Sequence, residues 1–215
     1  MRRPDRSEIE DEEYITYLGS AVSADGRLSK ELSRRLGMAY GTFKDLARLW
    51  RHSALGRKRK IEIFNTLVVS KLLYGLAACW LSKAERRKLD GFQNRCLRAI
   101  WGIKPAYVSR VSNAQVLQTT GEKPLTRSLE SQQLILFGKV ARMGPGELMR
   151  DVTFCPGSLR PATERYVRKV GRPRLEWTSG VHRMAEVAAG GALLLDATVA
   201  DRSVWKNAVE AYAKR

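Results

Sequence analysis

Apolar residues are densest between Ile61 and Trp80, where they cover most of the circumference of a predicted helix. The apolar positions of this segment are Ile61, Ile63, Phe64, Leu67, Val68, Val69, Leu72, Leu73, Tyr74 and Leu76. This pattern predicts a helix buried at the centre of a bundle, and Gly75 allows a neighbouring element to pack closely. Asn65 and Lys71 interrupt the apolar run, which favours a core helix over a membrane span.

The following segment predicts a helix with one apolar and one basic side. Ser82-Lys83-Ala84-Glu85 has the pattern of a capping box, and Gly102 marks the end of the helix. Its apolar side carries Leu89, Phe92, Cys96, Leu97 and Ile100. Much of its remaining surface carries Lys83, Arg86, Arg87, Lys88, Arg95 and Arg98. A buried helix beside a basic one is therefore the unit around which we expect the chain to be organised.

Elsewhere the pattern predicts one hairpin and several further helices. Residues 14–19 are rich in aromatic and β-branched types, and Ala24-Asp25-Gly26-Arg27 has the composition of a turn. We expect one strand near residues 14–18 and a second near 21–23 or beyond 27. The spacing of apolar positions predicts helices near residues 30–50, 113–120, 124–143, 176–188 and from about 201 onward. Ser29 and Ser112 are the expected N-caps of the first two.

Changes in composition divide the chain into four segments. We expect an acidic tail and the hairpin in residues 1–28, a helical bundle in 29–103, connecting helices in 104–152, and a basic linker with C-terminal helices in 153–215. Pro and Gly punctuate the linker, which carries six Lys and Arg against Glu164 up to residue 174 and is expected to be ordered only against a partner. The predicted fold class is mainly α, with a short N-terminal β-hairpin, a helical bundle and a looser helical C-terminal region.

The charge of the chain indicates its class of partner. The 215 residues include 39 Lys and Arg against 22 Asp and Glu, a formal net charge of +17. Because the basic residues cluster on segments that are also predicted to be structured, nucleic acid is the expected partner. We expect no membrane partner. The alternative is a non-catalytic interaction or scaffold protein whose basic face docks on an acidic protein or a ribosome.

Cysteine and histidine usage narrows the compartment and the chemistry. Cys79, Cys96 and Cys155 have no close spacing, which predicts free thiols and an intracellular location, either the nucleus or the cytoplasm. His52 and His182 are the only histidines, and neither has a second metal-type ligand at helical spacing. We therefore expect no zinc site.

Carboxylates are scattered rather than paired, which argues against metal-assisted catalysis. The isolated aspartates are Asp25, Asp45, Asp90, Asp151, Asp196 and Asp201, and they fall at predicted turns or helix ends. We interpret them as caps or surface charges, and the run Glu10–Glu13 as a solvated tail. No catalytic residue, metal or cofactor is expected in this chain.

Binding chemistry is better represented. The predicted phosphate contacts are Arg57, Lys58, Lys60, Arg86, Arg87, Arg95 and Arg98, with Arg172 and Arg174 as a second group. Arg172-Pro173-Arg174 is equally consistent with a basic linker. The tryptophans at positions 80, 101, 177 and 205 stand beside aliphatic residues at helical spacing, so they are expected in the core, with base stacking as the alternative.

An ordered series of landmarks resembles one family. The series is Tyr17-Leu18-Gly19-Ser20, Asp25-Gly26-Arg27-Leu28, Glu31-Leu32-Ser33-Arg34-Arg35, Leu72-Leu73-Tyr74-Gly75 with Trp80, Phe92-Gln93-Asn94-Arg95-Cys96-Leu97-Arg98, Val111-Ser112-Asn113, Leu136-Phe137-Gly138-Lys139-Val140-Ala141-Arg142-Met143, Gly171-Arg172-Pro173-Arg174 with Trp177, and Asp201-Arg202 with Trp205. From about Tyr14 to Tyr212 it resembles the region after the polymerase palm in reverse transcriptases of non-LTR (LINE-type) retrotransposons.

This resemblance implies a division of labour along the chain. Residues 14–28 would match the hairpin that ends the palm, 29–103 the helical thumb that tracks the template–primer duplex, and the remainder the linker that grips template RNA or target DNA. The family's Tyr/Phe-x-Asp-Asp motif is absent, Lys139 stands where His is usual, and Ala77-Ala78 where Glu is common. The resemblance thus implies a thumb and linker fragment, without catalysis of its own, whose partners are an RNA–DNA duplex, template RNA or target DNA and the rest of the retrotransposon polyprotein.

Overall fold

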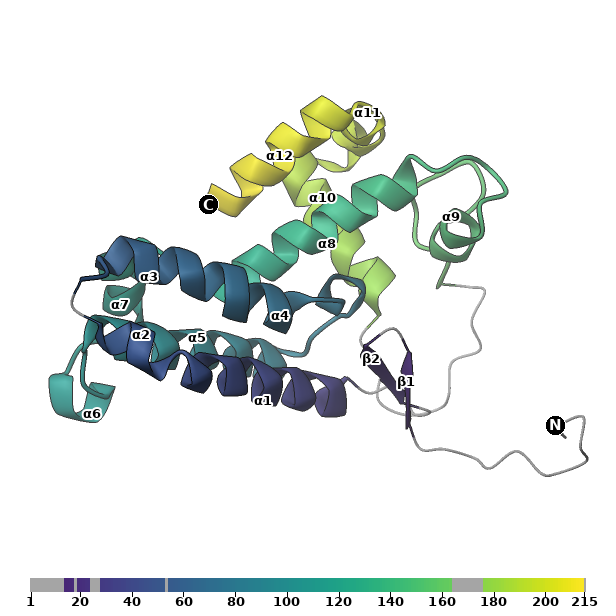
Figure 1. The fold of residues 1–215 in the computed structure, drawn as a ribbon. Coiled ribbons are helices and arrows are strands. Elements are labelled where there is room, and N and C mark those ends of the chain that lie inside the picture. Colours follow the sequence, from purple (N-terminus) through teal and green to yellow (C-terminus); the bar gives the residue numbers. More distant parts are fainter. Residues whose placement is uncertain (1–13, 18, 24–27, 53, 164–175, 215) are drawn as a thin grey trace, which may run out of the picture.

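The computed structural model of the protein describes residues 14–17, 19–23, 28–52, 54–163 and 176–214. These residues form a mainly helical fold with one short β-hairpin near the N-terminus, so the predicted fold class is confirmed (Figure 1). The predicted acidic tail, the turn at residues 24–27 and most of the predicted basic linker lie outside the described residues.

The hairpin consists of β1 (Tyr14–Tyr17) and β2 (Ser20–Ser23), which pair antiparallel with Tyr17 opposite Ser20. Gly19 in the connection has a φ of 78°, a left-handed conformation that a two-residue hairpin turn commonly requires. The first of the two expected positions for the second strand, near residues 21–23, is therefore the correct one.

A first bundle follows the hairpin and is built mostly around the expected central helix. Its elements are α1 (Ser29–Asp45), α2 (Ala47–Arg51), α3 (Arg57–Ile63), the π-helical η1 (Phe64–Val69), α4 (Ser70–Leu73), the 3₁₀ turn η2 (Leu76–Ala78), α5 (Lys83–Trp101), α6 (Ala106–Ser109) and α7 (Asn113–Thr120). The elements α3, η1 and α4 form one continuous helix. This helix and α5 both contribute to one buried cluster, which we call the first core. The first core includes Leu32, Phe64, Leu72, Leu89 and Leu97.

Some helix boundaries differ from the expected ones. The central helix ends at Leu73 and not near Trp80, because Gly75 adopts a φ of 73° that ends it. Leu28, not Ser29, is the N-cap of α1, and the predicted helix over residues 30–50 is divided at Leu46 into α1 and α2. By contrast, the capping box of Ser82 with Glu85 and the cap at Ser112 are confirmed.

A second helical unit packs against the end of the first. Its elements are α8 (Leu125–Ala141), α9 (Leu148–Thr153), α10 (Trp177–Ala189), the 3₁₀ turn η4 (Ala192–Leu194), α11 (Leu195–Ala200) and α12 (Arg202–Lys214). Helix α8 belongs to both units: Leu125 and Leu129 lie in the first core, whereas Leu134 and Phe137 lie in a second buried cluster, the second core. Figure 1 shows α10 and α12 beside α8, with the C-terminal end of α12 near the start of α8, where the Lys123 ammonium donates to the Ala213 carbonyl.

Three tryptophans make contacts that hold the helices of the second unit to one another and to the first unit. Trp205 is buried against Gly138 of α8 and donates through its indole N–H to the Leu134 carbonyl at 3.0 Å. Trp80 packs on Gly180 of α10, and the Trp177 indole N–H donates to the Ala77 carbonyl at 2.7 Å. These indoles are structural, as expected for tryptophans among aliphatic neighbours.

In the part of the chain that the structure describes, every helix is too short or too polar to cross a lipid bilayer.

Candidate nucleic-acid interface

Helix α5 turns a line of cations and small residues toward solvent. The exposed or half-exposed residues of this surface, which we call the basic face of α5, are Lys83, Ala84, Arg87, Lys88, Gly91, Arg95 and Ala99. The pairs 83–84 and 87–88 and the single positions 91, 95 and 99 follow one another at spacings of three or four residues, so they share one side of the helix. A side chain at Gly91 would meet no atom within 4 Å, which shows that the space in front of this face is open.

The two acids of α5, Glu85 and Asp90, form hydrogen bonds within the fold. The Glu85 carboxylate accepts hydrogen bonds from the Ser82 backbone N–H at 2.8 Å and from its hydroxyl at 2.7 Å. The Asp90 carboxylate accepts from the Thr126 backbone N–H at 2.9 Å and from its hydroxyl at 2.7 Å, at the start of α8. Within the basic face the charge is therefore of one sign.

Four of the predicted phosphate contacts are exposed. Arg87 and Arg95 lie on the basic face of α5, and Arg57 and Lys58 lie at the start of α3. The Arg57 guanidinium stands 5.8 Å from the centre of the Trp101 ring, in the last turn of α5. The beginning of α3 therefore adds its charge at the C-terminal end of α5.

Three other predicted contacts are turned inward. Lys60 is 7% exposed and its ammonium donates to the Trp50 carbonyl at 2.8 Å, at the end of α2. Arg98 is also 7% exposed. Arg86 pairs with Glu130 of α8 at 2.6 Å, and its guanidinium lies 4.7 Å from the centre of the Trp80 ring. In all three, a long cationic side chain satisfies carbonyl or carboxylate groups inside the fold, so none of them is available at the surface.

The remaining predicted pair, Arg172 and Arg174, lies outside the described residues. Sequence reasoning omitted Lys83 and Lys88 from the predicted contacts, although both were recognised as basic positions of the helix. The helical spacing of Lys83 and Lys88 relative to Gly91 and Arg95 was the signal that places both lysines on this face and separates them from Arg86.

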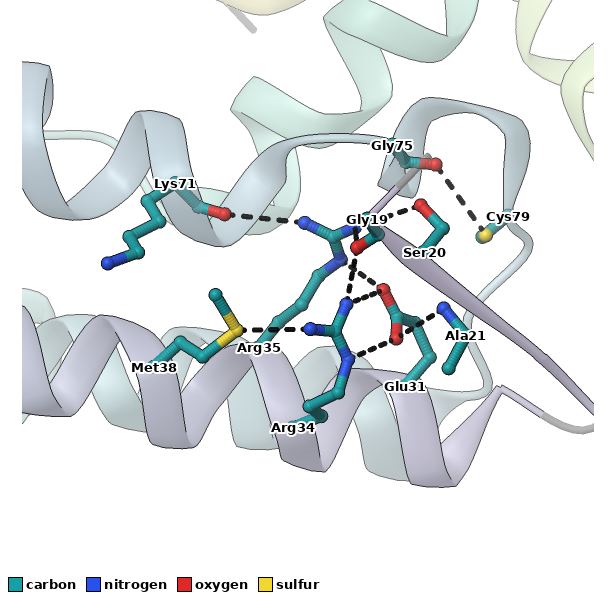
Figure 2. Close-up of polar contacts among 10 residues, drawn as sticks. All are labelled: Gly19, Ser20, Ala21, Glu31, Arg34, Arg35, Met38, Lys71, Gly75 and Cys79. Atoms are coloured by element: carbon teal, nitrogen blue, oxygen red, sulfur yellow. Dashed lines mark hydrogen bonds and ion pairs between the residues drawn. The ribbon is translucent and has the colours of Figure 1, made fainter. Parts of the chain in front are cut away.

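A buried ionic cluster fixes the hairpin on the first bundle (Figure 2). The Glu31 carboxylate pairs with Arg34 at 2.8 Å and with Arg35 at 2.5 Å, and it accepts from the Ala21 backbone N–H of β2 at 2.9 Å. Both arginines also donate to the Gly19 carbonyl in the hairpin turn, at 2.6 and 3.1 Å. One carboxylate thus joins α1 to β2, and two guanidiniums join α1 to the turn.

Arg35 extends this cluster to the end of the central helix. Its guanidinium donates to the Ser20 hydroxyl at 2.9 Å, and to the Lys71 carbonyl at 3.5 Å. A side chain at Gly75 would meet the Ser20 hydroxyl at 2.9 Å and the Arg35 guanidinium at 3.4 Å. Figure 2 shows these groups converging between α1, the hairpin and the Gly75 turn. The close approach expected at Gly75 is therefore present, and the hairpin is the element that approaches.

Burial and local charges shift the pKa of Glu31 and of two thiols. Burial alone would raise the pKa of Glu31, but hydrogen bonds from Arg34 and the Ala21 N–H, with the charge of Arg35, outweigh it and lower the pKa. Burial raises the pKa of the Cys79 thiol to about 11 and that of the Cys96 thiol to about 12. Both thiols are therefore protonated at neutral pH and are poor nucleophiles.

Among the described residues, no three His, Cys, Asp or Glu side chains come together in a group that could hold a metal ion. Comparisons of the chain with models of protein families, with curated proteins and with solved structures find no match.

Proposed function

We propose that this chain binds a nucleic-acid duplex through the basic face of α5, as the thumb and linker portion of a LINE-type reverse transcriptase, without catalysing a reaction itself. One observation carries the proposal. The exposed side of α5 presents four cations, whereas both acids of the helix accept hydrogen bonds inside the fold. The cations are Lys83, Arg87, Lys88 and Arg95, and the acids are Glu85 and Asp90.

The geometry of the basic face suits a phosphate backbone. Gly91 and the alanines at positions 84 and 99 have short side chains beside the cations. A polyanion can therefore approach the helix axis closely while Lys88 and Arg95 reach its phosphates. Contacts of this kind are sequence-independent and weaken as salt rises, because binding releases condensed counterions. The mode of recognition is charge neutralisation and shape, with no base code.

The resemblance supports a duplex as the ligand. It aligns residues 29–103 with a thumb that tracks template and primer, and α5 lies within this range. An RNA–DNA hybrid is accordingly the first substrate to test, with template RNA and target DNA after it. Action beside the rest of a retrotransposon polyprotein, in the nucleus or cytoplasm, belongs to the same proposal.

The decisive experiment measures affinity for a short RNA–DNA duplex across a salt series. The test variant is the triple substitution Arg87→Glu, Lys88→Glu and Arg95→Glu. Its control reverses three exposed cations of the second unit, with Arg183→Glu, Arg202→Glu and Lys206→Glu. Both variants have the same net charge, so a difference between them reports position and not overall charge.

We expect the unmodified chain to lose affinity with a log–log slope of roughly −0.9 for each phosphate contact, the value for B-DNA. The α5 variant should bind at least tenfold more weakly at moderate salt and show a shallower slope, while the control stays close to the unmodified chain. Equal losses in both variants would contradict a localised interface. Retained duplex affinity in the α5 variant would place the interface outside the basic face. Weak duplex binding that neither variant changes would favour a basic surface that docks on an acidic protein or a ribosome.

A further inference from the structure

One of the inward-facing arginines, Arg98, holds the loop that follows α5 in place. Residues 103–112, which we call the tip loop, contain the short helix α6 and run from the end of α5 to the capping box of α7. The Arg98 guanidinium donates to the Lys104 carbonyl at 3.2 Å, to the Val111 carbonyl at 2.7 Å and to the Asn113 side chain at 3.1 Å. One buried cation therefore fixes both ends of the tip loop against the last turns of α5.

Between these fixed ends, the tip loop exposes side chains that a folded core would normally take up. Tyr107 is 82% exposed and Val108 is 50% exposed, and Figure 1 shows α6 at the outer edge of the first bundle. Lys104 and Arg110 flank them and are exposed too. An aromatic ring held in water between two cations is the arrangement found where proteins stack on the bases of single-stranded nucleic acid.

The backbone of the tip loop is strained at one of these cations. Arg110 has a φ of 58°, and among the described residues it is the one non-glycine residue with a positive φ. This conformation costs an arginine free energy that glycine would not lose. The strained position carries an exposed cation three residues after Tyr107, where glycine would suit the backbone better.

The charge around the tip loop is of one sign over a long stretch. No acidic residue occurs from Gly91 to Gly121, while Arg95, Arg98, Lys104 and Arg110 fall within it. Because Arg98 joins the tip loop to the turns of α5 that follow Arg95, the tip loop continues the basic face of α5 toward the C-terminal end of the helix. The charge complements a polyanion and repels a basic peptide.

We infer that the tip loop binds an unpaired nucleotide where a duplex on α5 gives way to a single strand, with Tyr107 stacking on the base and Lys104 and Arg110 contacting the flanking phosphates. The inference rests on the proposed function and extends it from duplex binding to recognition of a duplex–single-strand junction. Stacking on a tyrosine ring tolerates every base, so the site reads the presence of an unpaired base and not its identity.

The test compares two ligands, a blunt RNA–DNA duplex and the same duplex with a short single-stranded extension that carries a fluorescent base analogue at the junction. The unmodified chain should bind the extended ligand more tightly and quench the analogue. Tyr107→Ala should remove this preference, a loss of about tenfold in affinity for the extended ligand. Tyr107→Phe keeps the ring and should keep both the preference and the quenching.

Two further variants separate the roles of charge and strain. Arg110→Gly removes the cation but suits the left-handed backbone, so the fold should be kept while the salt slope for the extended ligand falls by roughly 0.7, the value per contact for a single strand. Tyr40→Ala removes a half-exposed tyrosine of α1, away from the tip loop, and should leave the preference unchanged.

The outcomes distinguish the inference from the proposed function. Salt-dependent binding of both ligands with no effect of Tyr107→Ala would overturn the inference and leave duplex binding on α5 intact. Failure of the unmodified chain to bind either ligand would overturn both. Loss of affinity for blunt and extended ligands alike in Tyr107→Ala, with unchanged thermal stability, would contradict a junction contact and assign Tyr107 to the duplex itself.

Discussion

The two units of the molecule meet within α8 but differ sharply in charge. Residues 28–124 contain 20 Lys and Arg against six Asp and Glu, an excess of 14. Residues 125–215 contain 15 against nine, an excess of six, of which four fall in residues 164–175, outside the described helices. Both stretches form helices around buried clusters of similar composition, so a helical unit of this chain needs no surplus of positive charge in order to fold. The exposed part of the surplus in the first unit is therefore available for a partner.

The two units also differ in the side chains that hold their elements together. The first unit uses buried cations: Arg35 holds the hairpin, Lys60 the end of α2, and Arg98 the tip loop. The second unit uses indoles packed on glycines, with Trp205 on Gly138. Some of the positive charge of the first unit is thus structural, and only the exposed remainder can bind a polyanion.

The largest effect is expected from Glu31→Gln in the hairpin cluster. Glu31 and Arg35 have side chains that are each 4% exposed, so removal of the negative charge leaves a buried guanidinium without its counter-ion. Loss of one partner from a buried pair costs about 3 kcal/mol or more in the free energy of unfolding. Urea unfolding at neutral pH, followed by circular dichroism, measures this difference.

The same variant has a defined pH dependence. The pKa of Glu31 is lowered in the fold, so its contribution to stability is present above the unfolded value of about 4.3 and is lost as the pH falls through the folded value. The difference in stability between Glu31→Gln and the unmodified chain should therefore shrink on acidification. As a control, Glu62→Gln removes a half-exposed carboxylate and should change stability by less than about 0.5 kcal/mol at neutral pH. A constant difference across the acid range would contradict the assigned role of Glu31.

A smaller effect is expected where the second unit closes. A methyl group at Gly138 would overlap the buried ring of Trp205, so Gly138→Ala should lower the free energy of unfolding by about 2 kcal/mol. Gly37→Ala in α1 is the matched control, because a methyl group there meets no atom within 4 Å and should leave stability unchanged or raise it by up to about 1 kcal/mol. Thermal unfolding of both variants tests the contrast, and equal effects would contradict the packing of Trp205 on α8.

Periodicity and capping chemistry predicted most of this fold. The capping box at Ser82, the cap at Ser112-Asn113 and the ends at Gly102 and Gly121 depend on residues close together in sequence, and the structure has all four, with Ser112 as the second cap. The division at Leu46 and the short helices α6, α9 and α11 were not predicted, because tertiary packing and not local pattern sets them. The use of α8 by both cores is likewise a property of contacts between distant segments.

The binding site was harder to predict for a physical reason. Arg95 and Arg98 look alike in sequence, but Arg98 lies under the tip loop, which reaches it only in three dimensions. The landmarks that carry the family resemblance show the same limit. Gly19, Arg35 and Gly75 belong to landmarks that meet in the hairpin cluster, as Arg98 and Asn113 meet at the tip loop. The contacts of these landmark residues hold the fold together, and the exposed cations of the basic face of α5 are a separate set of side chains.

The finest test of the comparison uses two adjacent arginines at the start of α5. Arg86 pairs with Glu130, and its side chain is 17% exposed at the junction of the two units, whereas Arg87 is exposed on the basic face. Arg86→Ala should lower the free energy of unfolding by about 1 kcal/mol, because Glu130 keeps its second partner, Arg127, at 3.1 Å. Arg87→Ala should change stability by less than about 0.5 kcal/mol.

Nucleic-acid binding should separate the pair in the opposite direction. Arg87→Ala removes one phosphate contact and should reduce the salt slope by roughly 0.9, while Arg86→Ala, measured well below its unfolding temperature, should leave the slope unchanged. A shallower slope in Arg86→Ala would mean that its guanidinium leaves Glu130 to meet the ligand, and that the junction of the two units rearranges on binding. The paired measurement thus decides whether Arg86 has only a structural role and Arg87 only a binding role, as their positions in the unbound fold indicate.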